Sequence, residues 1–387
     1  MTKVGGAPGT VLRVPLRLFV AAVASALVLP ALALAAPPDP EARAFLVVNA
    51  STGEVLASRA PHARMPIASI TKLMTVLVAL EHAKLTEVVR VDRNAARVGE
   101  STINLRAGER LTVHDLVAAA LIQSANDAAV ALARYVGHGS TPAFVALMNA
   151  KARELGLHDT HFVRPDGLDA KGEVSSAADV VKLGEVAMHN PTIRRMVGER
   201  SATIAGGRHL TTWDDLLGTF PGLIGVKTGH TDAAGWCQVA AVRGDGLTVY
   251  TAILGSPTRS RRNSDLSLLL AWGLSRYRVT PLVQTGRTYA AAAVGYGRSP
   301  VPLVAERPLV RSVRLGHPFV ERVTAPAVLS LPVAAGQALG EVRVYQDGRL
   351  VGSRRLVAAR AAARPGLTAR VGWYAGRTVH HLWGWVS

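Results

Sequence analysis

The 387-residue sequence contains a single cysteine, Cys237, and only seven lysines. One cysteine excludes a disulfide within the chain and any zinc site built from cysteines alone. Twelve histidines are present, but no pair of them has a metal-binding spacing on a predicted helix face, so we expect no metal and no cofactor. Cys237 lies on a predicted strand and is expected to be a buried structural thiol. Because lysine is rare, a lysine inside a chemical motif carries extra weight.

Acidic residues are also scarce, with 27 Asp and Glu against 44 Lys and Arg, a formal net charge of +17. Residues 281–387 hold 14 arginines, no lysine and four acids, which favours either an anionic partner or a solvated arginine-rich surface. RNA-binding aromatic patterns, a helix-turn-helix and Cys/His fingers are missing, so we predict no nucleic-acid binding. With 49% hydrophobic and 18% charged residues, the chain is too apolar to be disordered.

Residues 1–35 have the pattern of a signal peptide. Arg13 and Arg17 precede the uncharged stretch 18–35, which ends in Ala33-Leu34-Ala35. Signal peptidase requires small residues in this arrangement. Eighteen residues are also just long enough to span a bilayer, so a retained anchor stays open. The sequence therefore predicts export, with the mature protein starting near Ala36.

Apolar runs and turn signals predict a sheet whose strands flank a helical insertion. Strands are expected at 44–49, 54–58, 223–228, 235–242 and 247–254, and helices at 69–83, 113–121, 128–136, 143–155, 176–189 and 266–274. The first two strands should form a hairpin, and Ser176 should cap a helix. Since strands lie at both ends and helices between them, we expect an α/β (α+β) domain over residues 36–279.

The pattern changes after about Thr280, where short β-like runs replace helices. They lie at 301–305, 309–313, 327–331, 341–345 and 350–351. Asp347-Gly348 between the last two is a strong hairpin signal. We therefore predict a small all-β domain at 280–369. The final segment, 370–387, places most of its apolar residues on one helical face and its arginines on the other, as in a helix that lies on a membrane surface.

The first candidate motif is Ser69-Ile70-Thr71-Lys72, at the start of a predicted helix. Residues three apart share a helix face, so the Lys72 amine can reach the Ser69 hydroxyl. A serine hydroxyl becomes nucleophilic when a base takes its proton, and a lysine serves if its pKa is lowered. Alone, the motif also fits an ordinary capped helix with an exposed lysine.

Two further motifs follow. Ser124-Ala125-Asn126 begins 55 residues after Ser69, and Lys227-Thr228-Gly229-His230, at a strand end, begins 103 residues after Ser124. In the second motif, the Ser124 hydroxyl can relay a proton, and the Asn126 side-chain amide can hold a substrate carbonyl. A strand edge with glycine lets a peptide-like substrate lie alongside it. The third motif's lysine would face an anion, and each motif lysine should disfavour a charge on the other.

Together the motifs resemble those of penicillin-binding proteins and serine β-lactamases. The surrounding residues, including Met65-Pro66-Ile67-Ala68-Ser69 and Lys227–Gly235, resemble the low-molecular-weight D-alanyl-D-alanine carboxypeptidases over about residues 40–279. The segment 331–358 resembles that family's C-terminal β-domain. The resemblance implies a β-lactamase/transpeptidase-like domain with an antiparallel sheet, which trims peptidoglycan stem peptides by releasing their terminal D-Ala. β-Lactams would be covalent inhibitors.

The resemblance also implies a role for each motif residue. The assignments are Ser69 as nucleophile, Lys72 as general base, Ser124 as proton relay, Asn126 as substrate-positioning amide, Lys227 and Thr228 as carboxylate ligands, Gly229 as part of the substrate-binding strand, and the backbone N–H groups of Ser69 and His230 as the oxyanion hole. Arg262 is a further candidate contact for the carboxylate. Such enzymes commonly end in a membrane anchor, so we expect the tail to bind an anionic membrane surface, on the outer face of the cytoplasmic membrane or in the periplasm or cell wall.

Three alternatives remain beside the carboxypeptidase. An endopeptidase that cuts cross-links would use the same chemistry. A β-lactamase needs a second base, and the nearest match to its pattern, Glu154 with Leu157 and His158, lies within a predicted helix. A catalytically inactive wall-binding scaffold would be expected to have lost Ser69 or one of the motif lysines, and all are present.

Overall fold

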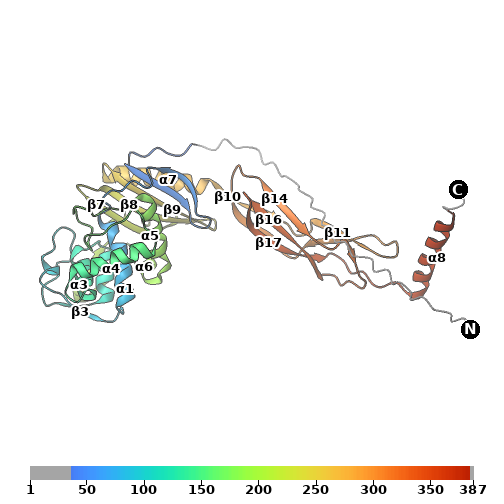
Figure 1. The fold of residues 1–387 in the computed structure, drawn as a ribbon, viewed down its shortest axis with the longest axis horizontal. Helices are drawn as coiled ribbons and strands as arrows, with labels where there is room; N and C mark the ends of the chain where they lie inside the picture. Colours follow the sequence, from blue (N-terminus) through green and yellow to red (C-terminus); the bar gives the residue numbers. More distant parts are fainter. Residues whose placement is uncertain (1–35, 384–387) are drawn as a thin grey trace, which may run out of the picture. The chain divides into compact units, whose positions relative to one another are not determined.

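The computed structural model describes residues 36–383 (Figure 1). The chain divides into two compact units, Leu34–Tyr277 and the part that begins at Arg278. The predicted signal peptide lies outside the described residues and stays a prediction. Among the residues described, none of the helices has the length and apolar character needed to cross a bilayer.

The first unit is built on a five-stranded sheet. Its strands are β1 (Ala44–Asn49), β2 (Glu54–Arg59), β7 (Leu223–Thr231), β8 (Gly235–Gly244) and β9 (Leu247–Ser256), in the order β2-β1-β9-β8-β7. All neighbouring strands are antiparallel. The first hairpin thus pairs with a strand from the end of the unit, as the sequence predicted, and β7 lies at the edge of the sheet.

Helices cover both faces of this sheet (Figure 1). They are α1 (Lys72–His82), α2 (Val113–Leu121), α3 (Asn126–Val136), α4 (Thr141–Glu154), α5 (Ala177–His189), α6 (Pro191–Met196) and α7 (Arg259–Ser275). Successive strand residues point to opposite faces: Val239 and Ala241 of β8 pack in the core that contains α1 and α5. Ala240 and Val242 belong to a second core, which contains α7. The sheet is therefore the middle of three layers, and Cys237 is fully buried in it.

Several short elements were not predicted. They are the strand pairs β3 (Val88–Arg90) with β4 (Arg110–Thr112) and β5 (Ser201–Ile204) with β6 (Arg208–Thr211), helix α6, and the 3-10 helices η1 (Ala68–Thr71), η2 (Ala95–Arg97) and η3 (Ala205–Gly207). Elements of three to six residues are too short to show a clear period in the sequence. Ser176 caps α5 as predicted, its hydroxyl accepting from the N–H of Asp179.

The second unit is mostly β-structure. Its strands are β10 (Tyr277–Val283), which begins at the boundary, β11 (Thr288–Val294), β12 (Val301–Ala305), β13 (Leu309–Arg314), β14 (Phe319–Thr324), β15 (Val328–Leu329), β16 (Ala338–Gln346) and β17 (Arg349–Ala358). Six of them form a sheet in the order β14-β16-β17-β12-β11-β15. Asp347 and Gly348 both have positive φ in the β16–β17 turn, as the hairpin signal requires. Helix α8 (Leu367–Trp383) starts three residues before the predicted segment.

Candidate active site

The local fold brings Ser69 and Lys72 together. Ser69 lies in η1, and Lys72 is the first residue of α1, which continues directly from it. The Lys72 Nζ lies 2.7 Å from the Ser69 Oγ. Ala68, just before the serine, has a φ of 51°, a conformation that is uncommon for a residue other than glycine and that is found at functional sites.

Lys72 is fully buried and has three hydrogen-bond partners. Besides the Ser69 hydroxyl, its Nζ contacts the Oδ1 of Asn126 at 2.7 Å and the backbone oxygen of Asp166 at 2.6 Å. Burial lowers the pKa of Lys72 from 10.5 to about 8, although the carboxylates of Asp166, Glu100 and Asp127 oppose the shift. A substantial fraction of this lysine is therefore neutral near neutral pH.

The second and third motifs also meet. The Lys227 Nζ donates to the Ser124 Oγ at 2.9 Å and to the backbone oxygen of Thr228 at 3.0 Å. Burial holds the pKa of Lys227 well below its usual value, and the ammonium of Lys72 adds to this effect. The expected influence of one lysine on the other acts here from Lys72 on Lys227, and burial dominates the pKa of each.

Gly229 allows β7 to lie directly against the nucleophile turn. A Cβ at this position would lie 2.8 Å from the backbone oxygen of Ile67 and 3.0 Å from the backbone nitrogen of Ser69. Any larger residue would therefore push the strand away from the serine. The neighbouring His230 is exposed and stacks on Trp236, with ring centroids 4.0 Å apart.

A cavity of about 490 Å³ opens beside Ser69. Its lining residues are Ser69, Glu100, Ser101, Ser124, Trp213, Thr228, Gly229, His230, Trp236 and Arg262. Five of the eight proposed site residues line it, while Lys72, Asn126 and Lys227 lie behind the wall, at most 3% exposed. The structure thus brings every residue of the three motifs to one place.

Some lining residues, such as Trp213 and Trp236, were not predicted from the sequence, whereas Arg262 was a candidate. Trp213 lies far from the motifs in the chain and donates from its indole nitrogen to the backbone oxygen of Gln123. Arg262, the extra candidate, is 1% exposed, although it lines the cavity, and its guanidinium lies 5.7 Å from the Trp236 ring centroid. These residues come from α7, β8 and a loop, so only the tertiary fold unites them with the motifs.

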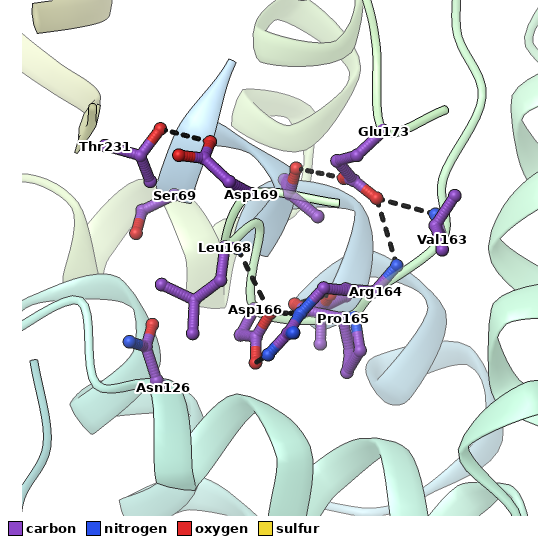
Figure 2. A network of polar contacts seen from close by, with 12 residues as sticks. Ser69, Asn126, Val163, Arg164, Pro165, Asp166, Leu168, Asp169, Glu173 and Thr231 are labelled. Carbon is purple, nitrogen blue, oxygen red and sulfur yellow. Dashed lines mark hydrogen bonds and ion pairs between the residues drawn. The ribbon is translucent and has the colours of Figure 1, made fainter. Parts of the chain in front are cut away.

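The loop 163–169 supports the nucleophile turn from behind (Figure 2). Asp166, whose backbone oxygen contacts Lys72, is held by a bidentate pair with Arg164 at 2.8 and 2.9 Å. The buried carboxylate of Glu173 accepts from the Thr71 hydroxyl at 2.8 Å and from the N–H groups of Val163 and Arg164 at 2.6 and 3.0 Å. These contacts join the loop to the turn that carries Ser69 and Lys72.

Comparison with known proteins identifies the family. A family model described as D-alanyl-D-alanine carboxypeptidase matches residues 32–258. The chain belongs to this family. The carboxypeptidase DacD of Salmonella typhimurium is 31% identical to it over 385 residues, which is 92% of this chain and 97% of the relative.

Solved structures confirm the predicted fold class. Penicillin-binding protein 5 of Haemophilus influenzae is 26% identical, covers 85% of this chain and 100% of its own, and has a TM-score of 0.63. Penicillin-binding protein D2 of Listeria monocytogenes, solved with ampicillin bound, is 31% identical over 61% of this chain and 99% of its own, with a TM-score of 0.56. The resemblance to low-molecular-weight penicillin-binding proteins and the prediction of an enzyme of this type are confirmed.

The second base of a β-lactamase is not found at the position considered. Glu154 ends α4, its side chain is 65% exposed, and it pairs with Lys151 rather than facing Ser69. Within residues 36–383, no group of three or more His, Cys, Asp or Glu side chains is arranged to hold a metal ion.

Proposed function

We propose that the chain removes the terminal D-Ala from peptidoglycan pentapeptides through an acyl-enzyme on Ser69. The observation that carries this proposal is the set of three contacts around the Lys72 amine. A neutral amine has two N–H donors and one lone pair. The Asp166 backbone oxygen can only accept, and so can the Asn126 Oδ1, whose amide nitrogen donates to Gly99. With both N–H groups so used, the lone pair faces the hydroxyl proton of Ser69, as a general base requires.

In the proposed acylation, the Ser69 Oγ attacks the carbonyl carbon of the penultimate D-Ala while its proton passes to Lys72. The carbonyl oxygen becomes an oxyanion, for which the backbone N–H groups of Ser69 and His230 are the proposed donors. The C–N bond then breaks, and the leaving D-Ala amine takes a proton through Ser124, which the Lys227 contact keeps in place. Water next hydrolyses the ester and restores the Ser69 hydroxyl.

The cationic side of the cavity supports the proposed binding of the substrate's terminal carboxylate. Lys227 has two hydrogen-bond partners and a third N–H available when charged, and Thr228 and Arg262 line the cavity beside it. β7 is the edge strand of the described sheet, so an extended peptide can lie along it, with Asn126 on the opposite side. This arrangement accounts for a substrate with a free carboxyl end.

Covalent trapping by penicillin tests the nucleophile. Intact-mass measurement should show one adduct on the wild-type protein and none on Ser69→Ala; an adduct that persists on the variant would contradict the assignment. Incubation with a D-Ala-D-Ala-ended pentapeptide and, separately, with a cross-linked dimer distinguishes the carboxypeptidase from the endopeptidase. Faster cleavage of the dimer would favour the endopeptidase.

We also propose that the enzyme is exported and lies on an anionic membrane surface through α8. Its proposed domains are the peptidase domain at 36–279, the β-rich domain at 280–369 and the C-terminal segment at 370–387. Leu367, Val371 and Tyr374 are 77, 64 and 56% exposed and, at spacings of four and three, share one helix face. Trp373 and Tyr374 both lie edge-on to Tyr296, with ring centroids 5.5 and 6.3 Å apart. The proposed contact with lipid is therefore supported by the exposed Leu367 and Val371.

Co-sedimentation with anionic vesicles tests this anchor. The form that starts at Ala36 and runs to the C-terminus should sediment with the vesicles, less so at high salt. A form ending at Ala369 should stay in the supernatant and keep its activity. Equal partitioning of the two forms would mean that the tail only packs on its own domain.

A further inference from the structure

Glu100 is the one acidic residue among those that line the active-site cavity. Arg262, which also lines the cavity, is basic, and so are Lys72 and Lys227 just behind its wall. The buried carboxylates of Asp127 and Asp166 act on Lys72 from behind the wall and do not line the cavity. The mechanism above gives the Glu100 carboxylate no task. Its position at the cavity therefore calls for a separate explanation.

The turn that carries Glu100 is fixed to the second catalytic motif on both sides. The backbone oxygen of Gly99 accepts from the Asn126 amide at 3.1 Å, and the backbone oxygen of Ser101 accepts from the Asn126 N–H at 2.7 Å. The Ser101 hydroxyl also donates to the backbone oxygen of Gln123 at 3.0 Å. Glu100 itself has a φ of 63°, which costs free energy for a residue with a Cβ. The contacts on either side hold it there.

The carboxylate of Glu100 is exposed and has no hydrogen-bond or ion-pair partner within residues 36–383. At longer range its charge acts on the Arg164 guanidinium, whose pKa it helps to raise. Its negative charge still reaches into the site, because it opposes the lowering of the Lys72 pKa. An unpaired anion in an active-site cavity is free to bind a cation of the substrate.

A peptidoglycan stem carries charges of both signs near the scissile bond. Its terminal carboxylate matches the basic side of the cavity. The residue that precedes the two D-alanines is a diamino acid, whose side-chain amine is charged until it is cross-linked. We propose that Glu100 binds this ammonium group, so that the enzyme selects stems whose diamino acid carries a free amine. This inference rests on the proposed function. It adds recognition of a second charged group of the substrate, the side-chain ammonium, to recognition of the terminal carboxylate.

The dimensions of an extended peptide fit this assignment. One residue spans about 3.3–3.6 Å, so the diamino acid begins one residue from the acylated D-Ala, on the side away from the terminal carboxylate. Asn126, which lies across from β7 and positions the substrate in the proposed mechanism, is directly bonded to both neighbours of Glu100. A side chain leaving the substrate on that side therefore approaches the carboxylate rather than the basic groups.

Two peptides that differ only in one charge test the proposal. They are Nα-acetyl-Lys-D-Ala-D-Ala, with a free ε-amine, and its Nε-acetylated form. The assay is run at pH 9, where the substrate amine, with a pKa of about 10.4, is still mostly charged. Lys72, with its pKa of about 8, is then mostly neutral. A change in the Lys72 pKa caused by the loss of the Glu100 charge therefore has little effect on the rate.

We expect kcat/KM to be about fivefold higher for the free amine in the wild type, through a lower KM, because the ion pair lies in a partly enclosed site. Glu100→Gln should reduce this ratio to about one, and Glu100→Lys should reverse it. Glu154→Gln, which removes an exposed acid that does not line the cavity, should keep the ratio near five. Raising the salt concentration should lower the wild-type ratio.

A wild-type ratio of one would overturn the inference, and so would a ratio that Glu100→Gln leaves unchanged. In the second case, slower turnover of both peptides would instead assign the carboxylate to the chemical step. Benzylpenicillin acylation of Ser69 separates this failure from failure of the proposed function. A protein that forms the adduct but shows no amine preference refutes only the role of Glu100, whereas absence of the adduct refutes the nucleophile itself.

Discussion

The pKa of Lys72 determines how acylation should depend on pH. With a pKa of about 8, about 9% of the lysine is neutral at pH 7, against about 0.03% for an ordinary lysine with a pKa of about 10.5. The folded environment therefore increases the population of the working base about 300-fold at this pH. Since only the neutral amine accepts the serine proton, the acylation rate should rise as pH rises and level off once Lys72 is neutral.

The second-order rate constant for acylation by a fluorescent penicillin measures this directly between pH 6 and 10. We expect the rate to rise about tenfold per unit below pH 7, to reach half its maximum near pH 8 and to be flat above pH 9. Lys72→Arg is the matched variant, because a guanidinium keeps its proton throughout this range. It should lose at least about 100-fold in rate. A wild-type rate that climbs steadily past pH 10, or near-normal acylation of Lys72→Arg, would refute the assignment of Lys72 as the base.

Three further predictions follow from the contacts around the site. Lys227→Arg keeps the charge but not the shape of a buried group, so the KM for a pentapeptide should rise about tenfold while kcat falls less, as steady-state kinetics will show. Gly229→Ala places a Cβ 3.0 Å from the Ser69 nitrogen and should slow penicillin acylation at least about tenfold; an unchanged rate would mean that the strand can shift without cost. Glu173→Ala leaves the Thr71 hydroxyl and two buried N–H groups without their acceptor, so urea unfolding should show a loss of about 2–5 kcal/mol, and Glu173→Gln should lose clearly less.

The sequence predicted those parts of the fold where local signals are strong. Long apolar runs located β1, β7, β8 and β9 to within a few residues, and the cap at Ser176 located the start of α5. The start of helix α7 was predicted seven residues too late, because its first turns are polar and only the cap at Thr258, whose hydroxyl accepts from the N–H of Arg261, marks its start. Its Arg262 is buried although it is charged, so the apolar pattern of the helix is interrupted on its buried side.

The motif residues could be predicted because their chemistry depends on side-chain type and spacing. The residues that tune them could not. The Asp166 oxygen that accepts a hydrogen bond from Lys72 is a backbone atom, which any residue would supply. Asp166 lies 94 residues from the lysine in the chain, and its ion pair with Arg164 holds it in place. The contacts of Glu173 and the place of Glu100 at the cavity likewise exist only after folding.

The two motif lysines show why side-chain identity alone leaves function open. Both are buried, and both have pKa values lowered chiefly by burial. Lys72 has two partners that only accept, plus the nucleophile, so its lone pair is directed at Ser69. Lys227 bonds a serine hydroxyl and a backbone oxygen, and the carboxylate of an incoming substrate would favour its charged form. In the proposed mechanism, the same side chain therefore acts as a base at one position and as an anion ligand at the other, because the acceptors around it differ.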